Sequence, residues 1–159
     1  MQAHADDITN WIRDWQDGDA AARDRVFTRL YGELKRLAAA VLRSESGHDT
    51  LQPTALLNDA LIKLTLAAQA PAADDRKHFA RIVARAMRQV LVDRARRKLA
   101  DKRGAGVAPA SLDGCDVAFS ANPEDLVALD SALATLARLD PRAASVVELR
   151  VFAGFTIEE

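Results

Sequence analysis

The chain has 159 residues, a formal net charge of −1 and one cysteine, Cys115. A single cysteine excludes both an internal disulfide framework and a zinc site built from cysteines. Charged residues interrupt every apolar stretch well short of the roughly 20 residues that a membrane-spanning helix needs, so we expect a cytoplasmic protein without a membrane segment.

Alanine- and leucine-rich segments with apolar residues at helical spacing predict helices along most of the chain, and no segment has the pattern of a strand. A first short helix has Asp6 and Asp7 as cap candidates, and Gly18 should end it. A second helix is predicted from about Asp19 to Arg43. A third begins near Pro53, which suits the first turn, and fades into an Ala/Pro-rich loop.

The fourth predicted helix is basic and has an apolar stripe that should pack on the second and third helices. Segment 104–123, with Gly, Pro, Ser and Asp spread through it, predicts a flexible linker. Two further helices follow, opened by Glu124 and by Asp140. The last residues, GFTIEE, look like the start of another helix, so we expect the chain to be cut short inside a second domain.

The predicted fold class is therefore all-α, with two small helical domains. The first domain should span residues 1–103, the linker 104–123, and the first helices of an incomplete second domain 124–159. A hairpin of two amphipathic helices rarely forms a domain by itself, which is why the second unit is expected to be incomplete.

Charge is distributed very unevenly along the chain. Residues 1–75 have a net charge of −4, residues 104–159 have −6, and residues 76–103 carry 11 Lys or Arg against 2 Asp or Glu, a net of +9. Such density on one helix costs stability unless a polyanion relieves it, and a nucleic-acid backbone would do so. The alternative is an Arg-rich face that is simply solvated.

Residue types that carry chemistry are sparse. His4, His48 and His78 are each isolated, and no second ligand-type residue stands at metal-binding spacing from any of them. No Gly-rich phosphate loop, nucleophile elbow or paired catalytic carboxylate set is present. Asp113 and Asp116 flank Cys115 and should make its thiol less reactive. We expect a protein that is not an enzyme and needs no cofactor or metal.

Three segments, in this order, resemble those of a bacterial extracytoplasmic-function (ECF) RNA polymerase sigma factor. They are TALLNDALIKL (54–64), HFARIVARAMRQVLVDRARRK (78–98) and EDLVALDSALATLARLDPRAASVVELRVFAGFTIEE (124–159). The resemblance implies that the first segment binds the clamp helices of the polymerase β′ subunit and that the second engages and melts the minus-ten promoter element. The third resembles the opening of a domain that reads the minus-thirty-five element, whose helix-turn-helix would follow.

The resemblance also implies roles for individual residues. In the segment that meets polymerase, Asn58 and Asp59 fall where the family usually has Gln-Glu contacts. The residues it implies for polymerase binding are Leu56, Asn58, Asp59 and Lys63.

For promoter DNA, the resemblance implies a basic pattern on the fourth helix. Arginines would hold phosphates, and Gln89 could address an unstacked base. Loop 69–75 falls where such factors capture the flipped minus-ten base, and Phe79 is the one aromatic residue near enough to stack. The residues implied for DNA binding are Arg85, Arg88, Gln89, Arg94, Arg96, Arg97 and Lys98, with Asp93 in the same pattern.

One departure from the family lies just before the polymerase-binding helix, where many relatives have an acidic cluster. In this chain the sequence there is TLQPTALLNDA (50–60), which resembles the same segment in the subgroup of ECF sigma factors controlled by serine/threonine kinases. A phosphate on Thr54 or Thr50 would restore the missing negative charge at a helix N-terminus, where it is favourable. The alternative is that either threonine merely caps the helix.

The leading hypothesis is thus a sigma factor that directs core polymerase to promoters and melts the minus-ten element, with a kinase as a further partner. The rival hypothesis is a helical protein-interaction adaptor whose basic helix binds an acidic protein. The two differ in whether purified core polymerase binds the chain.

Overall fold

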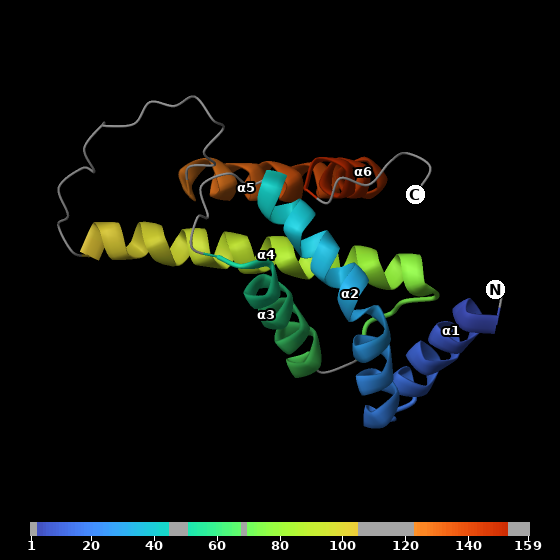
Figure 1. Ribbon diagram of the computed structural model, residues 1–159. Helices are drawn as coiled ribbons and strands as arrows, with labels where there is room; N and C mark the ends of the chain where they lie inside the picture. Colours follow the sequence, from blue (N-terminus) through green and yellow to red (C-terminus); the bar gives the residue numbers. More distant parts are fainter. Residues whose placement is uncertain (1–2, 45–50, 68–69, 105–122, 153–159) are drawn as a thin grey trace.

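The computed structural model describes residues 3–44, 51–67, 70–104 and 123–152, and this part of the chain is helical with no strand (Figure 1). The predicted all-α class is confirmed. The helices of these segments are α1 (Ala3–Gln16), α2 (Ala20–Ser44), α3 (Pro53–Leu66), α4 (Arg76–Gly104), α5 (Pro123–Leu139) and α6 (Pro141–Phe152). The linker predicted at 104–123 lies almost wholly outside the described residues.

The turn between α1 and α2 forms as its sequence predicts. Gly18 has a φ of +104°, a conformation that favours glycine, and its N–H donates to the carbonyl of Trp15 at 3.0 Å. Asp19 then caps α2, because its carboxylate accepts the N–H of Ala21 at 2.8 Å. At the other end of α1 the prediction was wrong: the helix begins at Ala3 and not at Asp6 or Asp7. Acidic residues are also favourable inside a first turn, so they do not mark the cap uniquely.

Other helix ends use proline and aspartate. Pro53 opens α3, and Gln52 occupies the cap position in extended conformation without a side-chain hydrogen bond. At α4 the carboxylate of Asp75 accepts the N–H of His78 at 2.8 Å. At α6 the carboxylate of Asp140 accepts the N–H of Ala143 at 3.0 Å, beside Pro141.

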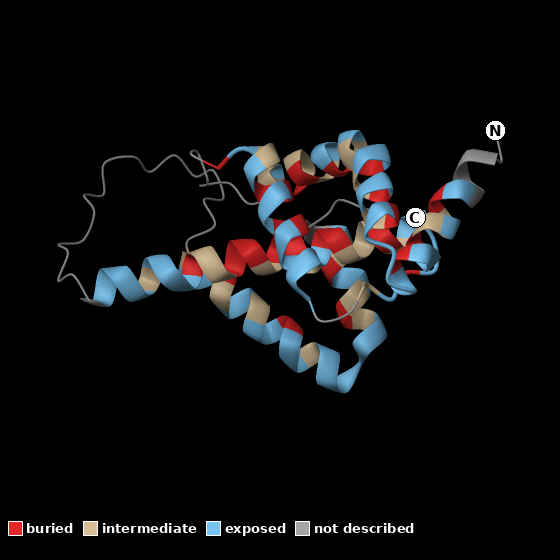
Figure 2. Ribbon diagram, turned by 90° about the horizontal axis from the view of Figure 1, so that it is seen from below, coloured by how far each residue is buried: buried red, intermediate tan, exposed pale blue. Residues whose placement is uncertain are grey.

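Helix α4 is the centre of the described structure, because each of the other five described helices contacts it. Its apolar stripe repeats every four residues through Phe79, Val83, Met87 and Leu91, all fully buried. The stripe packs on α2 and α3, as the sequence predicts. Figure 2 shows buried residues along the middle of α4 and exposed residues toward its C-terminal end.

Three aromatic rings join α1, α2 and the start of α4. Trp15 meets Phe27 edge to face, with ring centroids 5.4 Å apart, and Phe79 lies 6.1 Å from Trp15 and 6.4 Å from Phe27. Since Phe79 is fully buried in this cluster, its ring is not available to stack on a base.

Helices α5 and α6 form a hairpin that lies along α4 (Figure 1). Leu126 and Leu133 of α5 are buried and belong to the same apolar cluster as the stripe of α4. The hairpin therefore shares one core with the N-terminal helices in this conformation. None of the described helices has the length and apolar character needed to cross a membrane.

Candidate nucleic-acid interface

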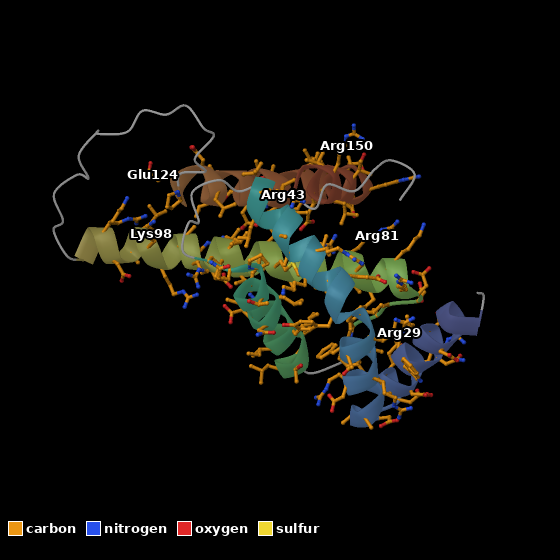
Figure 3. The ribbon with its side chains drawn as sticks, viewed as in Figure 1. Arg29, Arg43, Arg81, Lys98, Glu124 and Arg150 are labelled. Carbon is orange, nitrogen blue, oxygen red and sulfur yellow. The ribbon has the colours of Figure 1, made fainter. Side chains whose placement is uncertain are left out.

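Two groups of basic side chains on α4 have different surroundings. Toward its C-terminal end Arg97, Lys98, Lys102 and Arg103 are exposed, and Arg94 is half-buried. Figure 3 shows Lys98 on this part of the helix. Among the described residues, the Arg97 side chain donates to the backbone carbonyl of Asp93, at 3.4 Å. This end of α4 presents several cations to solvent, as backbone-phosphate binding requires.

The second group faces the α5–α6 hairpin. Arg88 is 6% exposed, its Nε donates to Glu148 at 2.6 Å, and its Nη1 pairs with Asp130. Arg85 donates to the other carboxylate oxygen of Glu148 at 3.2 Å. The two acids thus hold both sides of one buried guanidinium.

Asp130 extends the same network along α4. It accepts from Arg96 at 2.9 Å and from the side-chain amide of Gln89 at 3.4 Å. The side chains of Asp130 and Glu148 are 14% and 10% exposed, so most of the water around these charges is excluded and the ion pairs are weakly screened. A surface hollow of about 390 Å³ adjoins the network, between α4 and the hairpin.

Sequence reasoning placed Arg88 on the promoter face and did not identify Asp130 or Glu148. A signal for the burial of Arg88 was present, because Ala84, Arg88, Val92 and Ala95 recur at helical spacing and all four are buried. No comparable signal identifies the two acids. They lie on different helices, and only the folding of the hairpin brings them to one guanidinium.

On α3, four side chains share an exposed face, which we term the α3 face: Asn58, Asp59, Ile62 and Leu66. Ile62 and Leu66 are 56% and 79% exposed, unusual for residues of this size, and sequence reasoning did not single them out. Leu56 is fully buried and belongs to the core in this conformation.

Lys63 connects the two helices that the sequence assigns to polymerase and to DNA. Its Nζ lies 2.7 Å from a carboxylate oxygen of Asp93 on α4. Asp93 also lies 3.8 Å from the guanidinium of Arg96, one turn further along α4. Both Lys63 and Asp93 are more than 40% exposed, so the pair contributes little to stability.

The start of α3 has no acidic residue in its first turn and no side-chain cap. Thr54 is half-buried inside that turn, and Gln52 holds the cap position, so the alternative that Thr54 caps the helix is wrong. Thr50 lies outside the described residues. The first-turn N–H groups of α3 are therefore not bonded by a side-chain cap, a setting that favours added negative charge.

The loop before α4 is anchored to α1 and α2. The side-chain amide of Gln16 donates to the carbonyls of Pro71 and Ala73, at 3.0 and 2.9 Å. Arg76, which follows the loop, pairs with Glu33 of α2, and that hydrogen bond raises the pKa of the guanidinium above its usual value. Gln69 lies outside the described residues.

Ligand-type residues do not gather into a metal site in the part of the chain that the structure describes. The Nδ1 of His78 lies 3.3 Å from the backbone nitrogen of Asp74, which donates to it. Cys115, His48 and the side chain of His4 fall outside what is described.

A family model described as ECF sigma factor matches residues 5–159, which include all of α2 to α6. The chain belongs to the ECF sigma factor family. Neither the curated proteins nor the solved structures gave a match. The sigma factor acts with core RNA polymerase and promoter DNA to direct transcription, and its family is one of transcription regulators and not an enzyme class. The family match favours this reading over the adaptor hypothesis.

Proposed function

We propose that this sigma factor binds the clamp helices of polymerase β′ through the α3 face and engages the minus-ten element with α4. The observation that supports this most directly is an exposed apolar and polar face on α3 next to a helix whose exposed end is strongly basic. Helices α3 and α4 pack against each other and Lys63 pairs with Asp93 across them, so the two surfaces keep one relative orientation.

The α3 face has the composition of a specific docking surface. Ile62 and Leu66 offer apolar area at its centre, and Asn58 and Asp59 offer an amide and a carboxylate beside it. Interfaces gain affinity from such buried apolar anchors and specificity from the polar groups around them. Leu56 supports this face from inside the core.

In the promoter complex, the exposed cations of α4 bind DNA phosphates, and core polymerase makes the remaining contacts with the DNA. Arg97 and Lys98 are exposed and Arg94 is half-buried in this conformation. The other proposed contacts bond acids of the hairpin: Arg85, Arg88, Gln89 and Arg96. Helix α4 then stabilises the separated strands of the minus-ten element. An unstacked base of that element is received at the loop near Pro71 and Ala73.

Phosphorylation near the start of α3 would complete the polymerase-binding surface. A phosphate adds about −1.5 to −2 charges, and the uncapped N-terminus of α3 favours them. Thr54 is half-buried in the first turn, so a kinase acting there needs the turn to open, while Thr50 precedes the helix. A serine/threonine kinase is thus a proposed partner, and the cytoplasm, where polymerase works, the proposed compartment.

A binding experiment tests the α3 face. Ile62→Ser with Leu66→Ser in the full chain should weaken binding to the isolated β′ clamp-helix segment by at least about tenfold, the effect of losing roughly 1.4 kcal/mol. Val146→Ser with Leu139→Ser is the matched control, since these side chains are 54% and 81% exposed on the hairpin. Equal affinities of both double variants and the wild type would reject the α3 face.

A further inference from the structure

The contact between α4 and the hairpin has a consequence for DNA binding. We propose that the α5–α6 hairpin is an intramolecular lock, in which Asp130 and Glu148 occupy the arginines of α4 that would otherwise hold promoter phosphates. The inference rests on the proposed role of α4 in DNA binding. It adds that the conformation in Figure 1 is a closed state, and that promoter binding requires the hairpin to leave α4.

The ion pairs leave Arg88 no capacity for a phosphate. Its Nε and Nη1 are directed at Glu148 and Asp130, and only 7% of the side chain is exposed. Each carboxylate accepts one charge-assisted hydrogen bond from the guanidinium, the kind of bond by which arginine holds phosphate oxygens. The two carboxylates therefore take the place on the guanidinium that DNA phosphates would occupy.

The same two acids reach further along the helix. Glu148 takes the Nε of Arg85, while Asp130 takes Arg96 and the amide of Gln89. These partners span residues 85–96 of α4, about three helical turns. The side chains of Arg85 and Arg96 are still 56% and 50% exposed, and Arg97 and Lys98, just beyond this stretch, are exposed as well. The hairpin thus encloses Arg88, holds a carboxylate against each of Arg85 and Arg96, and leaves the end of the basic helix accessible.

Apolar contacts dock the hairpin on α4, but the apolar area that they bury is small enough for the hairpin to dissociate from α4. Leu126, Leu133 and Ala144 are buried, whereas Leu129 and Val147 are each 37% exposed. Among the described apolar side chains of the hairpin these three are the buried ones, and Val127 is partly buried against the core, so the charged network carries much of the specificity of docking. Removing these two carboxylates would take two opposing charges away from the buried guanidinium of Arg88, which favours undocking.

A closed state lowers the apparent affinity for DNA by the fraction of molecules that are open. The lock is tested in the full chain with Asp130→Asn and Glu148→Gln together. Asp14→Asn with Asp17→Asn is the control, because it removes the same charge from two exposed positions at the end of α1. Hydrogen exchange of the α5 and α6 amides reports undocking, and fluorescence anisotropy with a labelled 20-nucleotide oligo(dT) reports access to α4.

The lock predicts faster exchange in α5 and α6 and an oligo(dT) affinity at least about tenfold above wild type for the Asp130/Glu148 variant, with the Asp14/Asp17 control within about twofold of wild type. Unchanged exchange, or an equal affinity gain in the control, overturns it. If the double variant fails to fold, Asp130→Asn alone should give the same changes on a smaller scale, since Arg88 then keeps Glu148.

Binding of core polymerase, measured on the same proteins, separates this inference from the proposed function. A chain that binds polymerase but shows no change in exchange or DNA affinity is a sigma factor without a lock. If the hairpin undocks but no variant binds polymerase, the proposed function is rejected while the lock is kept. Undocking without any gain in DNA affinity overturns the masking of α4.

Discussion

Replacing Arg97 and Lys98 by glutamine should reduce the salt dependence of promoter binding by a calculable amount. Both side chains are exposed, and within the described part of the chain the Arg97 side chain bonds a backbone carbonyl of its own helix, so both are available to phosphates. Each phosphate contact on duplex DNA contributes about 0.9 to the slope of log K against log salt concentration. Losing two contacts should flatten that slope by about 1.8.

The affinity loss should then depend on salt. Between 0.05 and 0.2 M salt the concentration changes fourfold, so a slope difference of about 1.8 makes the loss about 12-fold larger at the lower concentration. The assay is anisotropy of a labelled duplex promoter with the reconstituted holoenzyme across that range. Lys35→Gln with Arg36→Gln, at exposed positions on α2, is the control. Identical slopes for Arg97/Lys98 variant and wild type would refute phosphate contact by this end of α4.

Three further predictions concern the switch, the core and the loop. Thr54→Glu or Thr50→Glu should raise affinity for core polymerase in a pull-down titration and alanine should not, because only glutamate supplies charge to the start of α3; equal affinities would dismiss the switch. Leu34→Ala should lower the free energy of unfolding in urea by about 2–5 kcal/mol, since Leu34 is 2% exposed; a loss below 1 kcal/mol would contradict its place in the core. Gln16→Ala should speed amide exchange in loop 70–75 without changing exchange in α3, because two hydrogen bonds to the loop are lost; unchanged exchange would argue against this anchor.

Local signals predicted most of the helices. Gly18, Pro53 and Asp140 each act within one or two turns of their own position, so their effect can be read from neighbouring residues. The apolar stripe of α4 was likewise readable, because its period is that of the helix. The start of α1 was not, since Asp6 and Asp7 are favourable both as caps and inside a first turn.

The site was harder to predict than the fold. Charge density identified α4, but it did not divide the arginines into an exposed end and a masked middle. That division depends on Asp130 and Glu148, which lie 34 to 63 residues beyond the α4 side chains that they bond. Nor did the spacing of apolar residues on α3 show that Ile62 and Leu66 stay exposed, because burial depends on which faces α2 and α4 cover.

Transcription in a purified system tests the central claim most directly. Core polymerase on fragmented genomic DNA, with and without the full chain, gives start sites that sequencing can map. We predict discrete start sites that appear only with the wild-type or Thr54→Glu chain and are lost when Ile62 and Leu66 are replaced by serine. Absence of any start site dependent on either chain would contradict the assignment of α3 to polymerase and α4 to the minus-ten element.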